Sequence, residues 1–81
     1  MEPKIHVNVK DKENIYFDGE ADAVTSFNDV GLFDILPLHE NFISLIKNKI
    51  ILHINGSQKE LKIEHGVLKV KDNKVNIYLG L

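Results

Sequence analysis

The sequence lacks cysteine, tryptophan and arginine altogether. Without cysteine the chain has no disulfide bonds and no thiolate ligands for a metal ion, which fits a reducing compartment. Without arginine it has no planar guanidinium group for bidentate binding of phosphate or carboxylate. All ten basic side chains are lysines, and together with the acidic residues they give a net charge of −2. This balance leaves no basic patch of the kind that binds nucleic acid.

Long hydrophobic runs are also missing. No segment approaches the roughly 18 consecutive apolar residues of a membrane-spanning helix. The first residues, Met1 to Lys4, do not show the charged and then apolar pattern of a secretory signal. The chain has 81 residues, of which 43% are hydrophobic, and this is enough for one packed core. We therefore expect a single domain over residues 1–81.

What the sequence contains is a repeated alternation of apolar and polar residues. Residues 4–9 alternate with the period of a half-buried strand, and similar segments follow at spacings of roughly 8–12 residues. Asp18-Gly19 and Asn55-Gly56 are typical of turns, and Asn48 and Gly66 are expected to separate further strands. This rhythm predicts an all-β fold, a single flattened β-sandwich or barrel of about eight to ten short strands. The expected strands cover residues 4–9, 15–17, 21–27, 30–35, 42–47, 49–55, 59–64, 67–71 and 75–79.

The segment from residue 31 to residue 49 interrupts this alternation. A bulky apolar stretch ends at Pro37, which cannot donate a hydrogen bond in a central strand. The apolar residues Phe33, Ile35 and Leu36 are explained equally well as core residues, with Pro37 turning the chain at an edge. Leu38 and His39 lie at the tip of the predicted loop, where polar residues are usual. We therefore interpret this tip as a contact surface.

Residues that could carry chemistry are present but do not form motifs. None of the four histidines is paired at a short chelating spacing, and no cysteine is available to complete a metal site. The serines lie in neither a G-x-S-x-G turn nor an S-x-x-K motif, and no glycine-rich loop opens a helix to hold phosphate. The sequence therefore predicts no metal, no cofactor and no catalytic residues.

Several segments resemble one known family, in order and over nearly the whole chain. Residues 31–39 read G-L-F-D-I-L-P-L-H and are followed by an apolar strand and a lysine. Residues 15–20 read I-Y-F-D-G-E, residues 64–70 read E-H-G-V-L-K-V, and residues 73–79 read N-K-V-N-I-Y-L. Together these segments are similar to the N-terminal β-sandwich domain of the epsilon subunit of rotary ATP synthases, which is called delta in mitochondria.

The chain departs from the family pattern in its central loop and in its length. An acid of the pattern is replaced by Leu32, so an apolar contact would take the place of a polar one. Two glycines of the pattern are replaced by Asp34 and Leu38, and we expect Asp34 to need a backbone conformation suited to glycine. Most family members continue into a C-terminal helical hairpin. Because this sequence ends at Leu81, we expect no C-terminal helical domain.

The resemblance implies a structural role without catalysis. A domain of this family packs against the gamma subunit at the foot of the central stalk and rests on the membrane c-ring. As part of the rotor it couples proton transport to ATP synthesis, peripheral to the membrane on the cytoplasmic face of the bacterial plasma membrane. The residues that match the family's contact surface for gamma and the c-ring are Asp11, Leu32, Leu38, His39 and Ser44.

Two other functions stay open from the residues themselves. A stand-alone β-sandwich could bind a peptide or a sugar, although two tyrosines and four phenylalanines offer little of the clustered aromatic platform that a sugar needs. A small hydrolase, whose catalytic residues would meet only in space, is the third hypothesis.

Overall fold

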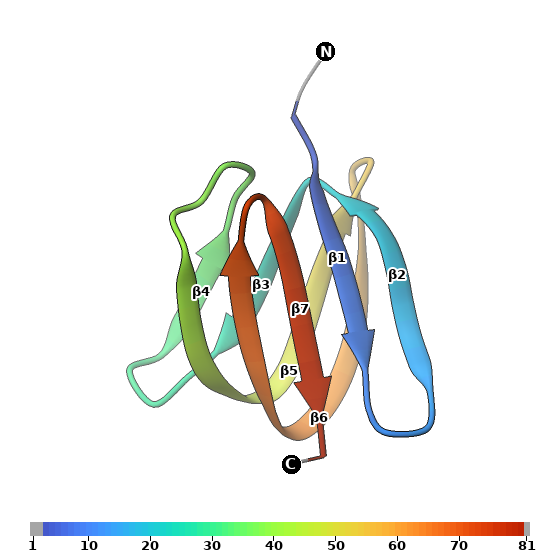
Figure 1. The fold of residues 1–81 in the computed structure, drawn as a ribbon, viewed down its shortest axis with the longest axis vertical. Helices are drawn as coiled ribbons and strands as arrows, with labels where there is room; N and C mark the ends of the chain where they lie inside the picture. The colour runs from blue at the N-terminus through green and yellow to red at the C-terminus, as the bar shows by residue number, and fades with distance from the viewer. Residues whose placement is uncertain (1–2, 81) are drawn as a thin grey trace.

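The computed structural model describes residues 3–80, and these residues form strands, turns and loops but no helix. Seven strands make a single sheet in the order β2-β1-β7-β6-β5-β3-β4 (Figure 1). Consequently, the described residues contain no helix that could cross a membrane. The strands are β1 (Ile5–Lys10), β2 (Ile15–Ala21), β3 (Ala23–Phe27), β4 (Leu32–Ile35), β5 (Phe42–Ile54), β6 (Ser57–Lys71) and β7 (Lys74–Leu79).

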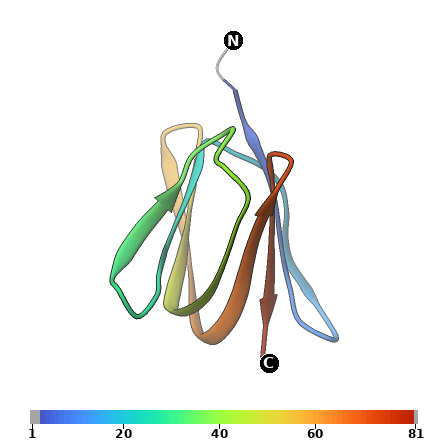
Figure 2. The same cartoon turned by 60° about the vertical axis from the view of Figure 1, so that its left-hand side comes forward.

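Two long strands fold this one sheet into two layers. β5 has 13 residues and β6 has 15, and both curve through the lower end of the molecule and return (Figures 1 and 2). Residues 42–47 of β5 pair with the second half of β6, and residues 48–54 pair with its first half. One layer holds β2, β1, β7, the second half of β6 and the first half of β5. The other layer holds the remaining halves with β3 and β4, which confirms the predicted flattened β-sandwich.

A β-bulge marks the bend of β5 and β6. Asn48 has a φ of 74°, and the register shifts between Lys47 and Asn48, which leaves Glu64 of β6 without a partner in β5. Asparagine tolerates this left-handed conformation better than most residues, and a bulge increases the local twist of a strand. The chain therefore bends here without leaving the sheet, and the predicted strand boundary at Asn48 is wrong.

Gly66 also lies inside a strand instead of separating two. It pairs with Ile46 on one side and with Leu79 on the other. A Cβ at this position would lie 2.9 Å from the backbone oxygen of Tyr78 and 2.9 Å from a methyl carbon of Leu79. Glycine is therefore required by the close approach of neighbouring strands, not by a break. Because both boundaries are absent, the predicted eight to ten short strands become seven, of which two are long.

The predicted two-residue turns have different outcomes. Asn55-Gly56 is confirmed, since φ values of 51° and 81° are those of a type I′ hairpin turn. Asp18-Gly19 is wrong as a turn, because Gly19 lies in β2 and pairs with Val7. The ring of Phe17 lies 3.3 Å from where a Cβ of Gly19 would be, so this glycine makes room for an aromatic ring.

The core between the layers consists of branched aliphatic side chains. In β1, Ile5, Val7 and Val9 are fully buried while the residues between them are half-buried, as the alternation predicts. Burying one such side chain stabilises the fold by about 1.5–3 kcal/mol before conformational entropy is subtracted. The buried apolar residues are Ile5, Val7, Val9, Ala21, Val24, Ile35, Ile46, Ile50, Leu52, Leu68, Val70, Val75 and Ile77. Phe33 packs against this core, but Leu36 is 58% exposed, so the interpretation of Leu36 as a core residue is wrong.

Polar contacts join the N-terminal strand to a hairpin at the upper end. The ammonium group of Lys4 forms an ion pair with Asp22 and donates a hydrogen bond to Oδ1 of Asn55 at 3.1 Å. The backbone N–H of Asn55 donates to Oδ2 of Asp22 at 2.7 Å. The hydrogen bond from Lys4, followed by that from the Asn55 amide, lowers the pKa of Asp22 below its ordinary value.

Gly66→Ala should lower the free energy of unfolding by about 1–3 kcal/mol, since the added methyl group meets a backbone oxygen that cannot rotate aside. Urea denaturation measures this loss. Gly19→Ala is the matched control and should lose less, because its nearest contact is a side-chain ring. Equal losses in the two variants would contradict the packing role assigned to Gly66.

Because the pKa of Asp22 is lower in the folded protein than in the unfolded chain, part of the free energy of unfolding should depend on pH. The folded protein holds this carboxylate unprotonated more strongly than the unfolded chain does, so its contribution is complete above the ordinary aspartate pKa. That contribution is lost as the pH falls through the lowered, folded-state pKa. Asp22→Asn should therefore lower the melting temperature at neutral pH and flatten its decline in acid, as thermal melts across this range would show. An unchanged acid slope in the variant would count against the assignment.

Candidate docking surfaces

The predicted contact residues lie in different parts of the sandwich. The loop between β4 and β5, which carries Leu38 and His39, is at the same end as the β6–β7 turn (Figure 1). The loop after β1, which begins with Asp11, and the loop before β4, which leads to Leu32, are at the opposite end. Ser44 lies on the first half of β5. The five residues therefore do not form one continuous patch.

His39 is half-buried and packs against the side of the sandwich. Its ring contacts Phe42 edge-on at 5.7 Å between centroids, and Phe42 makes a similar contact with Phe33 at 5.6 Å. Nδ1 of His39 lies 2.7 Å from the backbone oxygen of Glu40. These three rings close the gap between the layers beside β4, so His39 is a packing residue as well as a proposed contact.

Leu38 has the glycine-like backbone conformation that the sequence led us to expect at Asp34. Its φ is 65°, its side chain is 75% exposed, and its N–H donates to Oδ1 of Asn73 at 2.7 Å. Asn73 in turn donates to the backbone oxygen of Lys4 at 2.8 Å. Asp34 instead lies within β4, where it pairs with Thr25, so the expectation for Asp34 is wrong. A leucine held in a strained conformation at an exposed tip is an outlier that points to a function.

Asp11 uses its carboxylate to close the turn between β1 and β2. Oδ1 accepts hydrogen bonds from the backbone N–H groups of Glu13 and Asn14, each at 2.8 Å. The hydroxyl of Tyr16 donates to Oδ2. The bond from Tyr16, followed by those from the two amides, lowers the pKa of Asp11, and the same bond raises the pKa of Tyr16.

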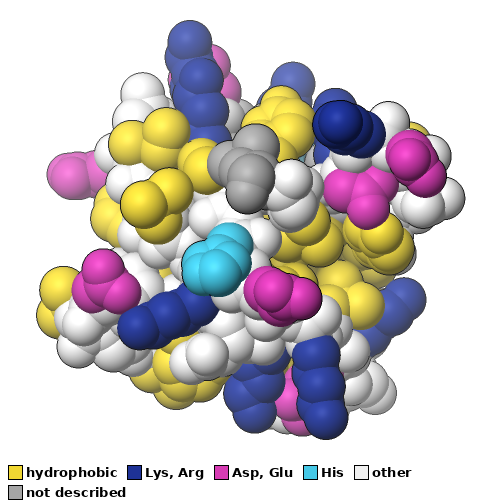
Figure 3. Space-filling view, turned by 90° about the horizontal axis from the view of Figure 1, so that it is seen from below, with side chains coloured by type: hydrophobic (Ala, Val, Ile, Leu, Met, Phe, Trp, Pro, Cys, Tyr) yellow, Lys and Arg dark blue, Asp and Glu magenta, His cyan; other side chains and the backbone are white. Residues whose placement is uncertain are grey.

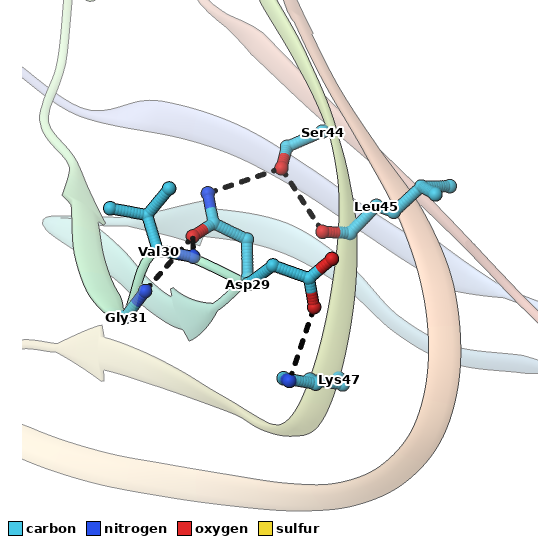
Figure 4. A network of polar contacts seen from close by, with 7 residues as sticks. Asp29, Val30, Gly31, Ser44, Leu45 and Lys47 are labelled. Carbon is cyan, nitrogen blue, oxygen red and sulfur yellow. Dashed lines mark hydrogen bonds and ion pairs between the residues drawn. The ribbon is translucent and has the colours of Figure 1, made fainter.

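Ser44 connects β5 to the loop between β3 and β4. Its hydroxyl oxygen accepts a hydrogen bond from the side-chain amide of Asn28 at 3.3 Å and donates to the backbone oxygen of Leu45 at 3.0 Å (Figure 4). Three positions further along the strand, Lys47 forms an ion pair with Asp29 of the same loop at 3.2 Å. Ser44 therefore positions the loop that leads to Leu32.

The sequence did not predict an apolar patch on the outer face of β5, β6 and β7. Ile43 and Leu45 are 67% and 74% exposed. Leu45 pairs with Val67, which pairs with Tyr78, so these side chains form a row across three strands. We call Ile43, Leu45, Val67 and Tyr78 the apolar face. The signal that could have revealed it is the segment F-I-S-L-I, in which both faces of one strand carry apolar residues.

A groove lies on the other side of the sandwich. It has a volume of about 560 Å³ and separates Tyr16 of β2 from the first half of β6. β2 ends the sheet, and residues 57–64 of β6 pair with β5 alone, so both borders of the groove are strand edges without a further partner strand in the described part of the chain. Its lining combines apolar and charged groups: Tyr16, Glu60, Leu61, Lys62, Ile63, Glu64, His65, Leu79 and Gly80.

One polar cluster has the residue types of a catalytic triad but not its arrangement. The hydroxyl of Thr25 donates to Asp34 and lies 2.8 Å from Nε2 of His53. Because the single hydroxyl proton goes to the carboxylate, the histidine does not stand between nucleophile and acid as a general base must. Thr25 is also buried, with 5% of its surface exposed.

Among residues 3–80, no three histidine or acidic side chains gather as they would to hold a metal ion.

Comparison with known proteins agrees with this architecture. Residues 4–79 match the family model described as the β-sandwich domain of the ATP synthase delta/epsilon chain. The chain is 32% identical over 75 residues to the ATP synthase epsilon chain of Leptospira borgpetersenii, which covers 91% of this chain and 59% of the relative. It is 35% identical over 79 residues to the epsilon chain of Clostridium botulinum. That alignment covers 95% of this chain and 59% of the relative.

A solved structure has the same fold. The match is to a chain of the Euglena gracilis mitochondrial ATP synthase in a structure of OSCP, F1 and the c-ring, with a TM-score of 0.87 at 18% identity. It covers 94% of this chain and 50% of that one. The present chain thus spans about three fifths of the length of these curated relatives. The chain belongs to the family of the ATP synthase delta/epsilon β-sandwich domain.

Proposed function

We propose that this domain is a non-catalytic rotor subunit of a rotary ATP synthase, which docks gamma onto the membrane c-ring and couples proton transport to ATP synthesis. Membership of the family and relatives named as epsilon chains support this role. The structural observation that carries it is the apolar face, since no element of the described chain covers Ile43 or Leu45. The domain would then be peripheral to the membrane, on the cytoplasmic face of a bacterial plasma membrane.

The apolar face suits an extended partner such as gamma. Its residues are neighbours across the strands. A contiguous apolar patch of this kind indicates an interaction site, whereas single exposed apolar residues are common on any protein surface. Lysines border it: Lys69 pairs with Ile43, and Lys10 lies over the ring of Tyr78 at 5.1 Å. An apolar centre with a polar rim is the usual anatomy of a protein interface.

The five predicted contact residues divide between the two partners by their place in the fold. Because the two loop ends are opposite each other, only one of them can face the ring (Figure 1). We assign Asp11, Leu32 and Ser44 to the ring end, since the loop before β4 carries Val30, which at 96% is the most exposed large apolar residue of the described chain. Leu38 and His39 then lie toward gamma.

A second candidate function is supported by the groove. An extended peptide could add its backbone to the open edge of β2 or β6 and place alternate side chains in the groove. Tyr16 is the one aromatic residue in the lining, so the groove favours a peptide over a sugar. A peptide screen that finds binding blocked by Ile63→Lys, with no affinity for gamma, would favour this alternative.

Leu45→Lys should weaken binding to purified gamma roughly a hundredfold, because it places a charge at the centre of the apolar face. Isothermal titration calorimetry gives the two affinities. Val30→Lys is the matched control, since Val30 is 96% exposed and lies outside the apolar face. If both variants bind gamma as wild type does, the apolar face is not the gamma site.

Leu38→Gly should make the domain more stable and yet weaken its binding to gamma. Relief of the left-handed conformation should raise the free energy of unfolding by about 0.5–1 kcal/mol, after the extra entropy of glycine is subtracted. Loss of the exposed leucine should nevertheless weaken gamma binding. Denaturation and titration of the same preparation measure both changes. A variant that is more stable and binds equally well would remove Leu38 from the contact set.

A further inference from the structure

The first half of β6 is an open edge of the sheet. Residues 57–64 pair with β5 on one side, and no strand of the described chain pairs with their other side. Such an edge presents backbone donors and acceptors to which a further strand can bond. The same edge borders the groove of about 560 Å³, so an added strand would also find apolar surface beside it.

The Asn55-Gly56 turn determines which backbone groups point out of this edge. A two-residue hairpin turn makes the flanking Ile54 and Ser57 a hydrogen-bonded pair, and bonded and non-bonded pairs then alternate along the two strands. Counted from the turn, Glu60 and Lys62 fall in non-bonded pairs. Their N–H and C=O groups therefore point away from β5 and out of the open edge.

Hydrogen bonds on the far side of β5 show the same alternation. His53 and Lys49 also fall in non-bonded pairs with β6, so their carbonyl oxygens should point away from β6. The oxygen of His53 accepts a bond from the backbone N–H of Asp22 at 2.7 Å. The oxygen of Lys49 accepts one from the hydroxyl of Ser26 at 2.9 Å. The pattern counted from the turn thus holds where its bonds are observed.

The outward side chains of the edge alternate in charge. Glu60 and Lys62 are exposed, whereas Leu61 and Ile63 between and beside them are half-buried and pack against the core. Lys62 lies opposite Lys49 of β5, and like charges directly opposite each other are unfavourable. The ammonium group of Lys49 pairs with Glu60 at 3.1 Å. The ion pairs among the described residues therefore leave Lys62 without a carboxylate.

We propose that the free domain forms a symmetric dimer through this edge, in which β6 pairs antiparallel with β6 of a second copy around a two-fold axis at Leu61. Glu60 then lies opposite Lys62 of the second copy, and Lys62 opposite its Glu60. Because both residues point their backbone groups out of the edge, each such pair can exchange two hydrogen bonds. Leu61 meets its own copy at a closely spaced, non-bonded position. The inference goes beyond the proposed function, since it involves neither gamma nor the c-ring.

Charge selects this register over its neighbours. An axis at Glu60 would place that carboxylate opposite its own copy, and an axis at Lys62 would do the same with two ammonium groups, and both arrangements are unfavourable. Seen from below, where β6 bends, lysines and acids lie side by side and form no field of one sign (Figure 3). The net charge of the chain is also only −2. Two copies can therefore approach without strong repulsion.

Sedimentation velocity of the domain alone, at concentrations up to the millimolar range, tests the dimer. A contact of one strand pair is small, so wild type should associate weakly and toward the upper end of this range. Glu60→Lys and Lys62→Glu each turn both favourable charge pairs into repulsive ones and should weaken the dimer roughly thirtyfold. A mixture of the two variants has opposite charges in both pairs again and should associate.

Two controls separate association from folding and from total charge. Lys62→Glu places an acid opposite Lys49, so it should weaken the dimer without lowering the free energy of unfolding. Lys69→Glu makes the same charge reversal in the second half of β6, where the strand has a partner on each side. It should associate as wild type does.

Methyl NMR at rising concentration identifies the surface that associates. The signals of Leu61 and Ile63 should shift, while those of Ile43 and Leu45 should not. Movement of the Ile43 and Leu45 signals instead would overturn the proposal, because association would then use the apolar face.

The proposal is also overturned if wild type stays monomeric throughout, or if the mixture of the two charge variants fails to associate. A monomeric wild type that binds an extended peptide in the groove would assign the edge to the second candidate function. Binding of gamma is measured separately, so the proposed function stands or fails independently of the dimer.

Discussion

The continuous pairing of β5 with β6 is the interaction on which the rest of this structure depends. It runs from Phe42 opposite Val70 to Ile54 opposite Ser57, and each strand contributes to both layers. A sheet that bends over on itself needs no separate element to cover its inner face, so 81 residues suffice for one enclosed core. The bulge between Lys47 and Asn48, where only Glu64 of β6 lacks a partner in β5, and the absence of a side chain at Gly66 allow the bend within one sheet.

Because of the same bend, one open side of the sandwich is closed by side chains while the other side keeps a groove. Where the first half of β5 becomes the edge of a layer, Phe33, Phe42 and His39 close the gap to β4. On the opposite side, β2 and the first half of β6 leave a groove. The outer side of the first half of β5 carries Ile43 and Leu45, so one strand supplies core residues, a docking face and the anchor for a loop.

Much of this fold could be predicted from the sequence, and the errors have physical causes. The alternation in β1 and the Asn55-Gly56 turn are local signals, and both hold in the structure. The predicted strand boundaries at Asn48, Gly66 and Asp18-Gly19 are wrong, because only pairing with distant strands shows that a turn-type residue lies inside a strand. The sequence also placed the glycine-like conformation at Asp34, whereas Leu38 adopts it, and there the Leu38 N–H donates to the distant Asn73.

The candidate site was less predictable, because contact surfaces are assembled across strands. Family resemblance directed attention to Asp11 and Ser44, whose polar groups turn out to fix loops. Tyr78 and Val67 join Leu45 only through pairing of strands that are far apart in sequence. Exposure of Ile43 could be suspected from the sequence, since Phe42 and Ile46 already fill the inner face of the same strand.

NMR of the methyl-labelled domain, recorded with and without purified gamma, tests most directly whether the apolar face is the docking surface. We predict that the methyl signals of Ile43, Leu45 and Val67 shift or broaden, while those of Leu61 and Ile63 in the groove stay unchanged. Perturbation of the groove signals with the apolar face unaffected would contradict the proposed role of this face.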